Sequence, residues 1–340
     1  MFGVKRAVVL PMMVAAIAAC QPAIAQVLSD SQEPGSLLVF PFIQTGTIGG
    51  VVATTITVSV TCPTGAICPL HQPVNLRLHW VCPASAGVCQ ERDFALATTV
   101  NGTVRFHPGD GGSIPAPPCF QGYLLVWVVD TFRNAIKFDG LSGKAVIHQL
   151  PTADTAYNAI PIQAGANLAN GAIISRDGAP LPFNGTGYKE VTGQITGGIQ
   201  FPGQTAPGAN GSLNTFLIFL TLDVMSNRPN PPTFVDFNFY NEAEAPISAS
   251  TSFTCWGFFF IDGTVPANFT TTGNGLVQSS QAQLATGAPV TLLGLVLTQE
   301  FSDGVFAHTI VPLLNNSVPV PTVFFPEGAI GPPPPVGGPQ

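Results

Sequence analysis

Apolar and polar side chains alternate with a period of two residues along many short segments of the chain. The segment "TTITVSVTC" places its Ile and Val side chains on one face and its Thr and Ser side chains on the other. The segment "VNLRLHWVC" places Leu76, Leu78 and Trp80 on a face that we expect to be buried, and Arg77 and His79 on a face that we expect to be solvated. This period is typical of half-buried β-strands, and helical periodicity is scarce.

The same pattern predicts strands along most of the chain, separated by turns that draw on 36 Gly and 33 Pro residues. Beyond the two segments above, we predict strands over 36–43, 93–98, 103–107, 122–129, 135–139, 144–148, 191–200, 215–224, 234–240, 247–261, 290–298 and 304–311. The Ala-rich segment "TADTAYNAIPIQAGANLANGA" reads as a loop with at most one helical turn, because Pro161 and Gly165 interrupt it.

Many short strands with Gly and Pro turns favour an all-β fold of antiparallel β-sandwiches, Ig-like or jelly-roll-like. The chain is long for one sandwich, so we predict two, over residues 35–175 and 186–326. We place the boundary in "RDGAPLPFNGTGYKE". Residues 327–340, which are rich in Pro and Gly, read as a disordered tail.

The N-terminus has the features of an export signal. Lys5 and Arg6 precede an apolar run that is shorter than the about 20 residues that span a bilayer, and "AIA" before Gln26 fits a cleavage site. We therefore predict a signal peptide over residues 1–25, no transmembrane span in the mature chain, and a location outside the cell or in its envelope. As an alternative, "IAAC" resembles a lipobox, which would leave Cys20 lipidated and the protein lipid-anchored.

Six cysteines remain once Cys20 is set aside, and an even number in an exported chain predicts three disulfides. The six are Cys62, Cys68, Cys82, Cys89, Cys119 and Cys255. Fifteen pairings are compatible with this number. Two close pairs, each after a strand-like run, favour Cys62–Cys68 and Cys82–Cys89, which leaves Cys119–Cys255 as a long-range bond.

Charge limits the classes of partner. Charged residues make up 9% of the chain and its net charge is −7. Because nucleic-acid binding needs cations on phosphates, we expect no nucleic-acid partner, and binding driven by anionic lipids is disfavoured for the same reason.

Glu242 and Glu244 lie in "NEAEAP", between two segments that alternate with a period of two. We interpret this segment as the exposed turn of a hairpin rather than as a catalytic carboxylate pair, because residues so close in a turn do not face each other across a substrate. Oxygen ligands from Asn241, Glu242 and Glu244 make a Ca²⁺ site an alternative, and Ca²⁺ is the one cofactor that we consider. We assign no catalytic residue: the five histidines show no metal-binding spacing, and no G-x-S-x-G motif is present.

The segment "FTCWGFFFI" is apolar on both faces. Trp256, Phe258 and Phe260 share one face, and Phe253 and Phe259 share the other. We expect one face to join the core and the other to contact the first domain or a partner.

The segments "GSLLVFPFIQT", "FQGYLLVWVVDTFRNAIKFDGLSGKAVI", "FLTLDV" and "FYNEAEAPISASTSFTCW" resemble uncharacterised secreted bacterial β-rich proteins. This resemblance implies a bacterial, exported origin and no particular activity, cofactor or site.

Two functions are compatible with these features. The first is a non-enzymatic secreted or cell-surface protein with a structural, adhesive or assembly role, in which we suspect that residues 36–43 take part in strand exchange with a neighbour. The alternative is an extracellular carbohydrate-binding or carbohydrate-active protein that uses aromatic faces and carboxylates, with a surface glycan as partner.

Overall fold

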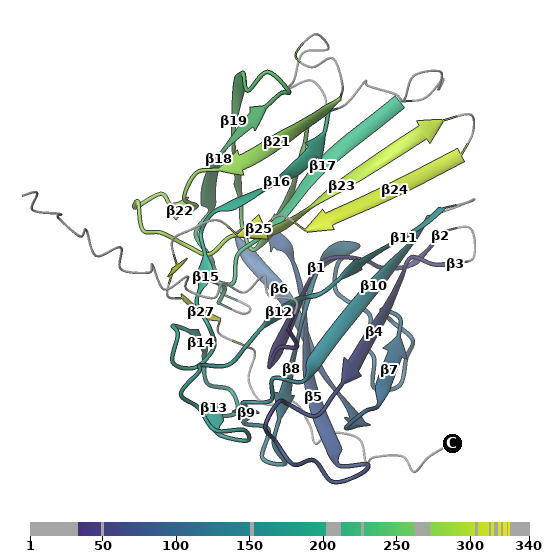
Figure 1. Ribbon diagram of the computed structural model, residues 1–340, viewed down its shortest axis with the longest axis vertical. Coiled ribbons are helices and arrows are strands. Elements are labelled where there is room, and N and C mark those ends of the chain that lie inside the picture. The colour runs from purple at the N-terminus through teal and green to yellow at the C-terminus, as the bar shows by residue number, and fades with distance from the viewer. Residues whose placement is uncertain are drawn as a thin grey trace, which may run out of the picture.

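The structure is a computed structural model, drawn in Figure 1. It describes residues 33–48, 51–149, 153–201, 212–225, 228–261, 269, 273–302, 305–312, 314–315, 319–320, 322–324 and 326. The predicted signal peptide, Cys20 and the predicted tail 327–340 lie outside the described residues.

Two sheets come from the first half of the chain. Sheet 1 has the order β12-β1-β8-β5-β6, with β9 beside β8 and β13 beside β9. Its strands are β1 (Leu37–Gln44), β5 (Pro73–Ser85), β6 (Val88–Thr99), β8 (Gln121–Val129), β9 (Ala135–Ile136), β12 (Ile160–Ile162) and β13 (Ile173–Ser175). Sheet 2 has the order β11-β10-β4-β7. Its strands are β4 (Thr54–Val60), β7 (Thr103–Phe106), β10 (Leu141–Gln149) and β11 (Ala153–Asn158).

Two further sheets come from the second half. Sheet 3 has the order β19-β18-β21-β16-β25, with β22 beside β18. Its strands are β16 (Ile195–Gln200), β18 (Thr233–Tyr240), β19 (Pro246–Phe253), β21 (Asn274–Ser279), β22 (Gln283–Leu284) and β25 (Leu314–Asn315). Sheet 4 has the order β20-β17-β23-β24. Its strands are β17 (Ser212–Leu220), β20 (Trp256–Phe260), β23 (Leu293–Ser302) and β24 (Val305–Pro312).

Three two-stranded ladders complete the fold. They pair β2 (Thr47–Ile48) with β3 (Val51–Val52), β14 (Leu181–Phe183) with β27 (Thr322–Phe324), and β15 (Val191–Thr192) with β26 (Pro319–Val320). Every strand pair described is antiparallel, which confirms the all-β prediction. No helix in the described part of the chain is long and apolar enough to cross a membrane.

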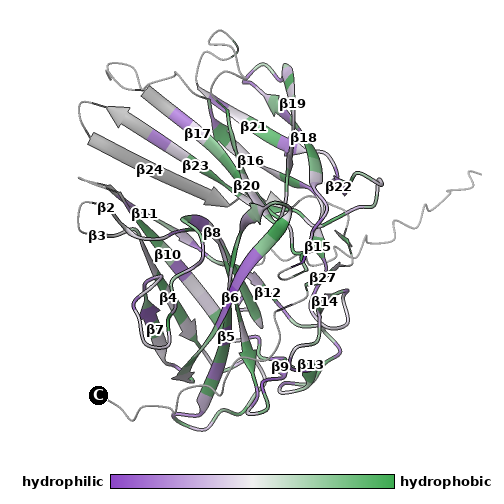
Figure 2. Cartoon of the chain, turned by 180° about the vertical axis from the view of Figure 1, so that it is seen from behind, coloured by the Kyte–Doolittle hydropathy of each residue, from purple (hydrophilic) through white to green (hydrophobic). Residues whose placement is uncertain are grey.

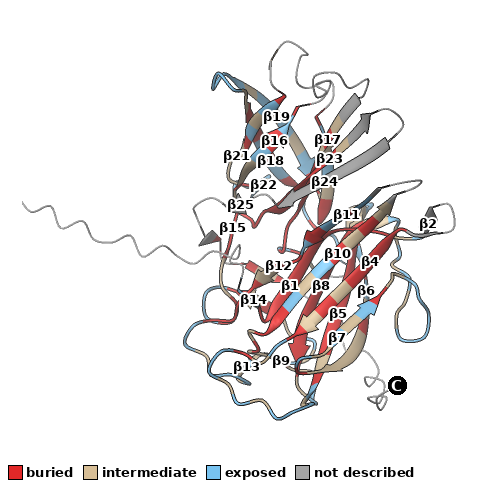
Figure 3. Cartoon of the chain, turned by 45° about the vertical axis from the view of Figure 1, so that its right-hand side comes forward, coloured by how far each residue is buried: buried red, intermediate tan, exposed pale blue. Residues whose placement is uncertain are grey.

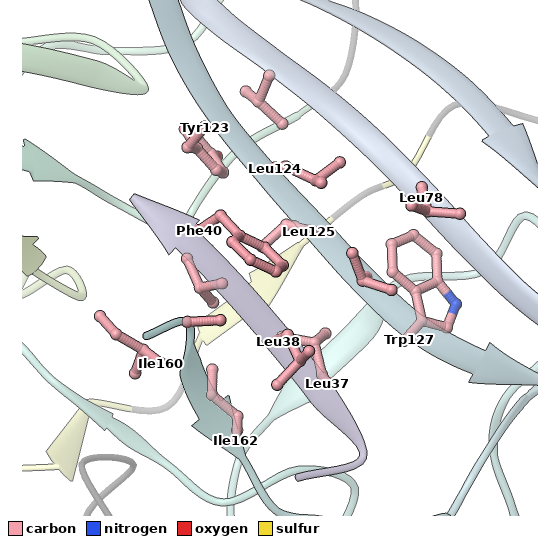
Figure 4. Packing of buried hydrophobic residues seen from close by; sticks show 14 of the residues in the cluster. Leu37, Leu38, Phe40, Leu78, Tyr123, Leu124, Leu125, Trp127, Ile160 and Ile162 are labelled. Atoms are coloured by element: carbon pink, nitrogen blue, oxygen red, sulfur yellow. The ribbon is translucent and has the colours of Figure 1, made fainter. Parts of the chain in front are cut away.

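Sheets 1 and 2 pack against each other through apolar side chains of β1, β8, β4 and β10. Phe40 of β1 stands opposite Leu124 of β8 in the ladder, and Leu38 stands opposite Val126. Figure 4 shows this part of the cluster, and Figure 3 shows β1 and β8 largely buried. Gly143 of β10 lies so close to β1 that a Cβ atom there would stand 2.6 Å from the Phe40 ring. Sheets 3 and 4 share a second cluster, in which the Phe219 and Phe237 rings lie 5.6 Å apart.

The two halves meet through sheet 4. Trp256 belongs to the same apolar cluster as sheets 1 and 2, and its indole Nε1 donates to the carbonyl oxygen of Pro41 at 2.9 Å. Pro41 sits at an irregularity in the register of β1, between Phe40 and Ile43, and its carbonyl accepts this indole N–H. The Tyr123 hydroxyl of β8 donates to the carbonyl of Thr221 at 3.2 Å.

Three disulfides form, as the cysteine number predicted. Cys62–Cys68 is confirmed. The other two predicted pairings are wrong, because the bonds are Cys82–Cys119 and Cys89–Cys255. Strands β5 and β6 continue almost through the segment that we interpreted as a stapled loop, with Ala84 opposite Cys89, so Cys82 and Cys89 are not opposite each other.

Two other expectations about the first half are wrong. Residues 36–43 form no loose strand for exchange: β1 lies between β12 and β8, and all its side chains are buried. The Ala-rich segment contains two strands, β11 and β12, rather than a loop. In β11 the alternate residues Thr155 and Tyr157 are buried, so packing against the sheet outweighs the modest strand propensity of Ala.

The predicted strand 247–261 is two strands in different sheets. The chain leaves sheet 3 after Phe253 and enters sheet 4 at Trp256, with Cys255 in the left-handed region at a φ of 69°. The two faces separate as predicted: Phe253 and Phe259 pack in the core of sheets 3 and 4, and Trp256 packs on the first half.

The segment that we took as the domain boundary is packed rather than exposed. Leu181, Phe183 and Tyr188 are buried, and the Phe183 and Tyr188 rings stack at 5.3 Å. Strand β27 pairs with β14 in this segment, and β26 pairs with β15 directly after it, so these two late strands lie against the connection between the two halves.

We expect Gly143→Ala to destabilise the protein by about 1–3 kcal/mol, because the new methyl group forces the Phe40 ring out of its position between the sheets. Chemical denaturation followed by tryptophan fluorescence measures this change. Gly198→Ala in β16 is the matched control, since no atom lies within 4 Å of the added Cβ. Equal stabilities of the two variants would contradict the close approach of β1 and β10.

Candidate functional site

The second face of β5 is buried, against our expectation that Arg77 and His79 are solvated. Arg77 is 3% exposed and His79 is fully buried. Trp127 of β8 stacks on the His79 ring at 4.5 Å, and Phe324 of β27 meets the ring edge-on at 5.9 Å. Asp177, which follows β13, bonds to Arg77. The sequence pattern of β5 did not predict this burial, because the residues that bury Arg77 and His79 come from segments far along the chain.

Arg77 links two carboxylates. Its Nη1 donates to Asp177 Oδ1 at 2.5 Å and its Nη2 donates to Asp93 Oδ2 at 3.0 Å. Arg133 adds a second guanidinium, with its Nε 3.5 Å from Asp177 Oδ2. The Arg77 guanidinium also lies 5.8 Å from the centre of the Trp127 ring, a cation–π contact.

His79 faces the two acidic residues of β6. Its Nδ1 contacts Asp93 Oδ1 and lies 3.4 Å from Glu91 Oε2. Figure 2 shows this hydrophilic stretch of β6 in purple. Burial alone lowers the pKa of His79, but the Asp93 and Glu91 carboxylates raise it more, so the pKa lies above its ordinary value. Burial, with Glu91 nearby, raises the pKa of Tyr123 well above its usual value.

The charges of this cluster, whose centre around His79 is buried, balance when His79 carries a proton. Asp93, Asp177 and Glu91 supply three negative charges, and Arg77 and Arg133 supply two positive charges. Adding the proton on His79 gives three charges of each sign. Because an uncompensated charge is costly in the interior, the geometry favours the protonated imidazole.

The same residues include metal-ligand types. One ligand atom from each of His79, Glu91 and Asp93 lies within 4.8 Å of the others, and such donors suit Zn²⁺. However, Arg77 lies 3.0 Å from Asp93 Oδ2 and repels a second cation there, and a divalent ion in place of the proton would leave an excess positive charge. We therefore interpret the cluster as an ion-pair network that holds β5, β6, the segment after β13 and β27 together.

A second group of polar side chains, connected by hydrogen bonds, crosses sheet 2. Thr55 Oγ1 lies 2.8 Å from His148 Nε2, and His148 Nδ1 lies 2.8 Å from Asp154 Oδ1. His107 Nδ1 lies 3.1 Å from the same hydroxyl. The spacing is that of a nucleophile, a base and an orienting carboxylate. Thr55 is 2% exposed, in a strand paired on both sides, so its hydroxyl has neither room for a substrate nor free backbone N–H groups beside it. We therefore interpret this hydrogen-bonded group as a structural contact that connects β7, β4, β10 and β11.

The "NEAEAP" segment is the turn of the predicted hairpin between β18 and β19. The side-chain oxygen of Asn241 accepts the backbone N–H groups of Ala243 and Ala245 at 3.0 and 2.9 Å, so it shapes the turn. Glu242 and Glu244 are exposed. The Ca²⁺ site at these three residues stays a prediction.

The tryptophans are not available to stack on a sugar, since Trp80, Trp127 and Trp256 are at most 4% exposed. A shallow hollow beside Cys119 has about 160 Å³ of empty space, part of which is open solvent. Ligand pockets for drug-sized molecules start at roughly 300 Å³, so this hollow does not enclose a molecule of that size.

No protein-family model and no curated protein matches the chain. Among solved structures, it is similar to the viral chemokine binding protein R17 encoded by rodent gammaherpesvirus Peru over 84% of this chain and 83% of that chain, with 11% identity and a TM-score of 0.14. A similarity this low supports no conclusion about fold or function.

We expect stability to fall as the pH rises above 6.5, the ordinary pKa of His79. A raised pKa means that the stabilisation by the His79 proton is fully present below pH 6.5 and is lost as the pH rises through the pKa of the folded state. His79→Gln should lose this part of the pH dependence and cost about 3–5 kcal/mol. Urea denaturation from pH 5 to pH 9, in about five steps, measures both effects. An unchanged pH profile in the variant would show that the imidazole does not carry this proton.

Arg77→Met should destabilise the protein by about 3–5 kcal/mol, since the Asp93 carboxylate is left buried without its guanidinium partner and Asp177 keeps only Arg133. Arg92→Met on the neighbouring strand is the control, because Arg92 is exposed and should change stability by no more than about 0.5 kcal/mol. Thermal denaturation of both variants tests the assignment, which fails if the two midpoints agree.

Proposed function

We propose that the chain is a non-enzymatic protein of the extracellular space or the cell envelope, built of two β-sandwich domains, with a structural, adhesive or assembly role. In this proposal sheets 1 and 2 form one sandwich and sheets 3 and 4 form the other. Three disulfides support an oxidising location, because such bonds persist outside the reducing cytosol.

The observation that carries the assembly role is an aromatic edge on sheet 4, formed by Phe216, Phe258 and Phe260. Phe258 is 54% exposed and Phe260 is 40% exposed, and both belong to β20, the edge strand of the sheet. The Phe216 ring lies 4.8 Å from that of Phe260 and 6.4 Å from that of Phe258. Three neighbouring rings thus line one edge of the sheet.

Such an edge favours association for two reasons. Exposed aromatic rings gain free energy when they leave water, and an edge strand offers backbone groups that pair with another strand. A second copy carries the same edge, so two copies related by a two-fold axis place ring against ring. This supports self-association through β20.

The carbohydrate alternative has less support, because the three tryptophans are buried and the carboxylates Asp93 and Glu91 converge inside the protein. Binding of the protein to glycans on an array, lost on substitution of the exposed phenylalanines, would favour that alternative instead.

We expect the protein to form dimers or larger assemblies as its concentration rises, and the double variant Phe258→Ser, Phe260→Ser to stay monomeric. Both rings are exposed, so their removal deletes the apolar contact without deleting a buried side chain. Sedimentation velocity over a wide range of concentration measures the assembly. Phe234→Ser, at a similarly exposed ring on β18, is the control and should associate like the original protein. A wild-type protein that is monomeric at every concentration would contradict the proposal.

A further inference from the structure

Four large apolar side chains stand in solvent at one end of the first half. Ile67 is 97% exposed, Leu70 is 82% exposed, Phe132 is 78% exposed and Ile173 is 53% exposed. Ile67 and Leu70 belong to the connection between β4 and β5, Phe132 to the turn between β8 and β9, and Ile173 to β13. We call these four residues the apolar tip.

Strand register places these segments at the same end. Asn75 of β5 pairs with Val129 of β8, so the chain before β5 and the chain after β8 leave sheet 1 side by side. The turn after β8 lies beside the segment after β13, since the Asp177 N–H donates to Asn134 Oδ1 at 3.2 Å. Figure 1 shows β9 and β13 together at the lower end of the molecule.

The loop that presents Ile67 and Leu70 is held by covalent and hydrogen bonds. Cys62 and Cys68 close a ring of seven residues, and within it the Ala66 N–H donates to the carbonyl of Pro63 at 3.0 Å. A closed loop has few conformations, so it cannot fold its apolar side chains back against the protein as a long open loop can. The exposure of Ile67 is therefore built into the loop.

The turn that presents Phe132 is fixed by Asp130. One carboxylate oxygen accepts the backbone N–H groups of Phe132 and Asn134 at 2.8 and 2.9 Å, and the other accepts the Asn134 amide at 2.9 Å. Arg133 takes a φ of 67°, which non-glycine residues adopt only where the surroundings impose it. The Asp130 carboxylate thus directs Phe132 into solvent.

The residue types and the shape identify the partner. Three of the four residues lie in connections at the end of sheet 1 and one lies in β13, and the anchors are aliphatic chains and one phenyl ring. Protein interfaces concentrate binding energy in Trp, Tyr and Arg, with Leu under-represented. Aliphatic and phenyl side chains on projecting loops instead suit insertion into the apolar boundary of a lipid layer. Arg176, three residues after Ile173, is exposed and supplies a guanidinium that can pair with a lipid phosphate.

We propose that the apolar tip inserts into the interface of a lipid bilayer and holds the protein on a membrane surface. Binding depends on burial of the apolar tip and one arginine, so it takes place on zwitterionic lipid and changes little with salt. This inference goes beyond the proposed function, because it uses a different surface from the aromatic edge of sheet 4.

The test is co-sedimentation of the protein with phosphatidylcholine vesicles at low and high salt, using protein whose intact mass shows no acyl chain. We expect the wild-type protein to bind at both salt concentrations. Ile67→Ser, Leu70→Ser and Phe132→Ser should each weaken binding about tenfold, and the triple variant should remain in the supernatant. Because these side chains are exposed, the variants should unfold at the wild-type temperature.

The double variant Phe258→Ser, Phe260→Ser is the matched control and should bind vesicles like the wild type while losing self-association. The triple tip variant should show the reverse, which separates this inference from the proposed function. Failure of the wild type to bind vesicles, or binding by the triple variant, would overturn the inference. The protein could also bind to cell-envelope membranes and lose that binding when the membranes are treated with protease. This result would assign the tip to a protein partner and would also overturn the inference.

Discussion

A charged side chain in a protein interior needs an opposite charge within reach, and this requirement organises the first half of the molecule. His79 of β5 stands directly opposite Asp93 of β6 in the ladder, and Glu91 lies two residues along on the same face. Cross-strand neighbours on one face are close enough to pair, so two of the three carboxylates come from the hairpin itself. The third, Asp177, comes from a segment about a hundred residues away in sequence. The network therefore forms only after that segment has folded over sheet 1.

Burial of the face of β5 that bears Arg77 and His79 costs desolvation energy but fixes the positions of distant segments. Buried ion pairs contribute little net stability, because desolvation offsets most of their attraction. The network instead fixes the position of late strands: Phe324 of β27 contacts His79, and β26 and β27 pair with the connection between the halves. Strand β27 is thereby fixed against sheet 1, while Trp256 fixes sheet 4 against the irregularity in β1. The halves meet through specific polar contacts inside one apolar cluster rather than across a linker.

Local alternation predicted what depends on local chemistry. The hairpin of β18 and β19, the two faces of "FTCWGFFFI" and the Cys62–Cys68 pair all follow from residues near each other in sequence. The errors arise where distant segments decide the outcome. Arg77 and His79 look solvated until Asp177 and Phe324 cover them. The hairpin of β5 and β6 turns at Ala86 and Gly87, both with positive φ, which shortens the loop assumed between Cys82 and Cys89 and sends each sulfur to a different partner. Neither candidate polar cluster was predicted, since their members share no sequence motif.

The bond between Cys89 and Cys255 spans 166 residues. A ribosome makes the chain from its N-terminus, so Cys89 must wait as a thiol while Cys62, Cys68, Cys82 and Cys119 already have their partners beside them. During that interval the nearest wrong partner is Cys82, seven positions away. Correct biogenesis therefore requires either that Cys82 is captured by Cys119 first or that a thiol isomerase repairs the mispaired chain.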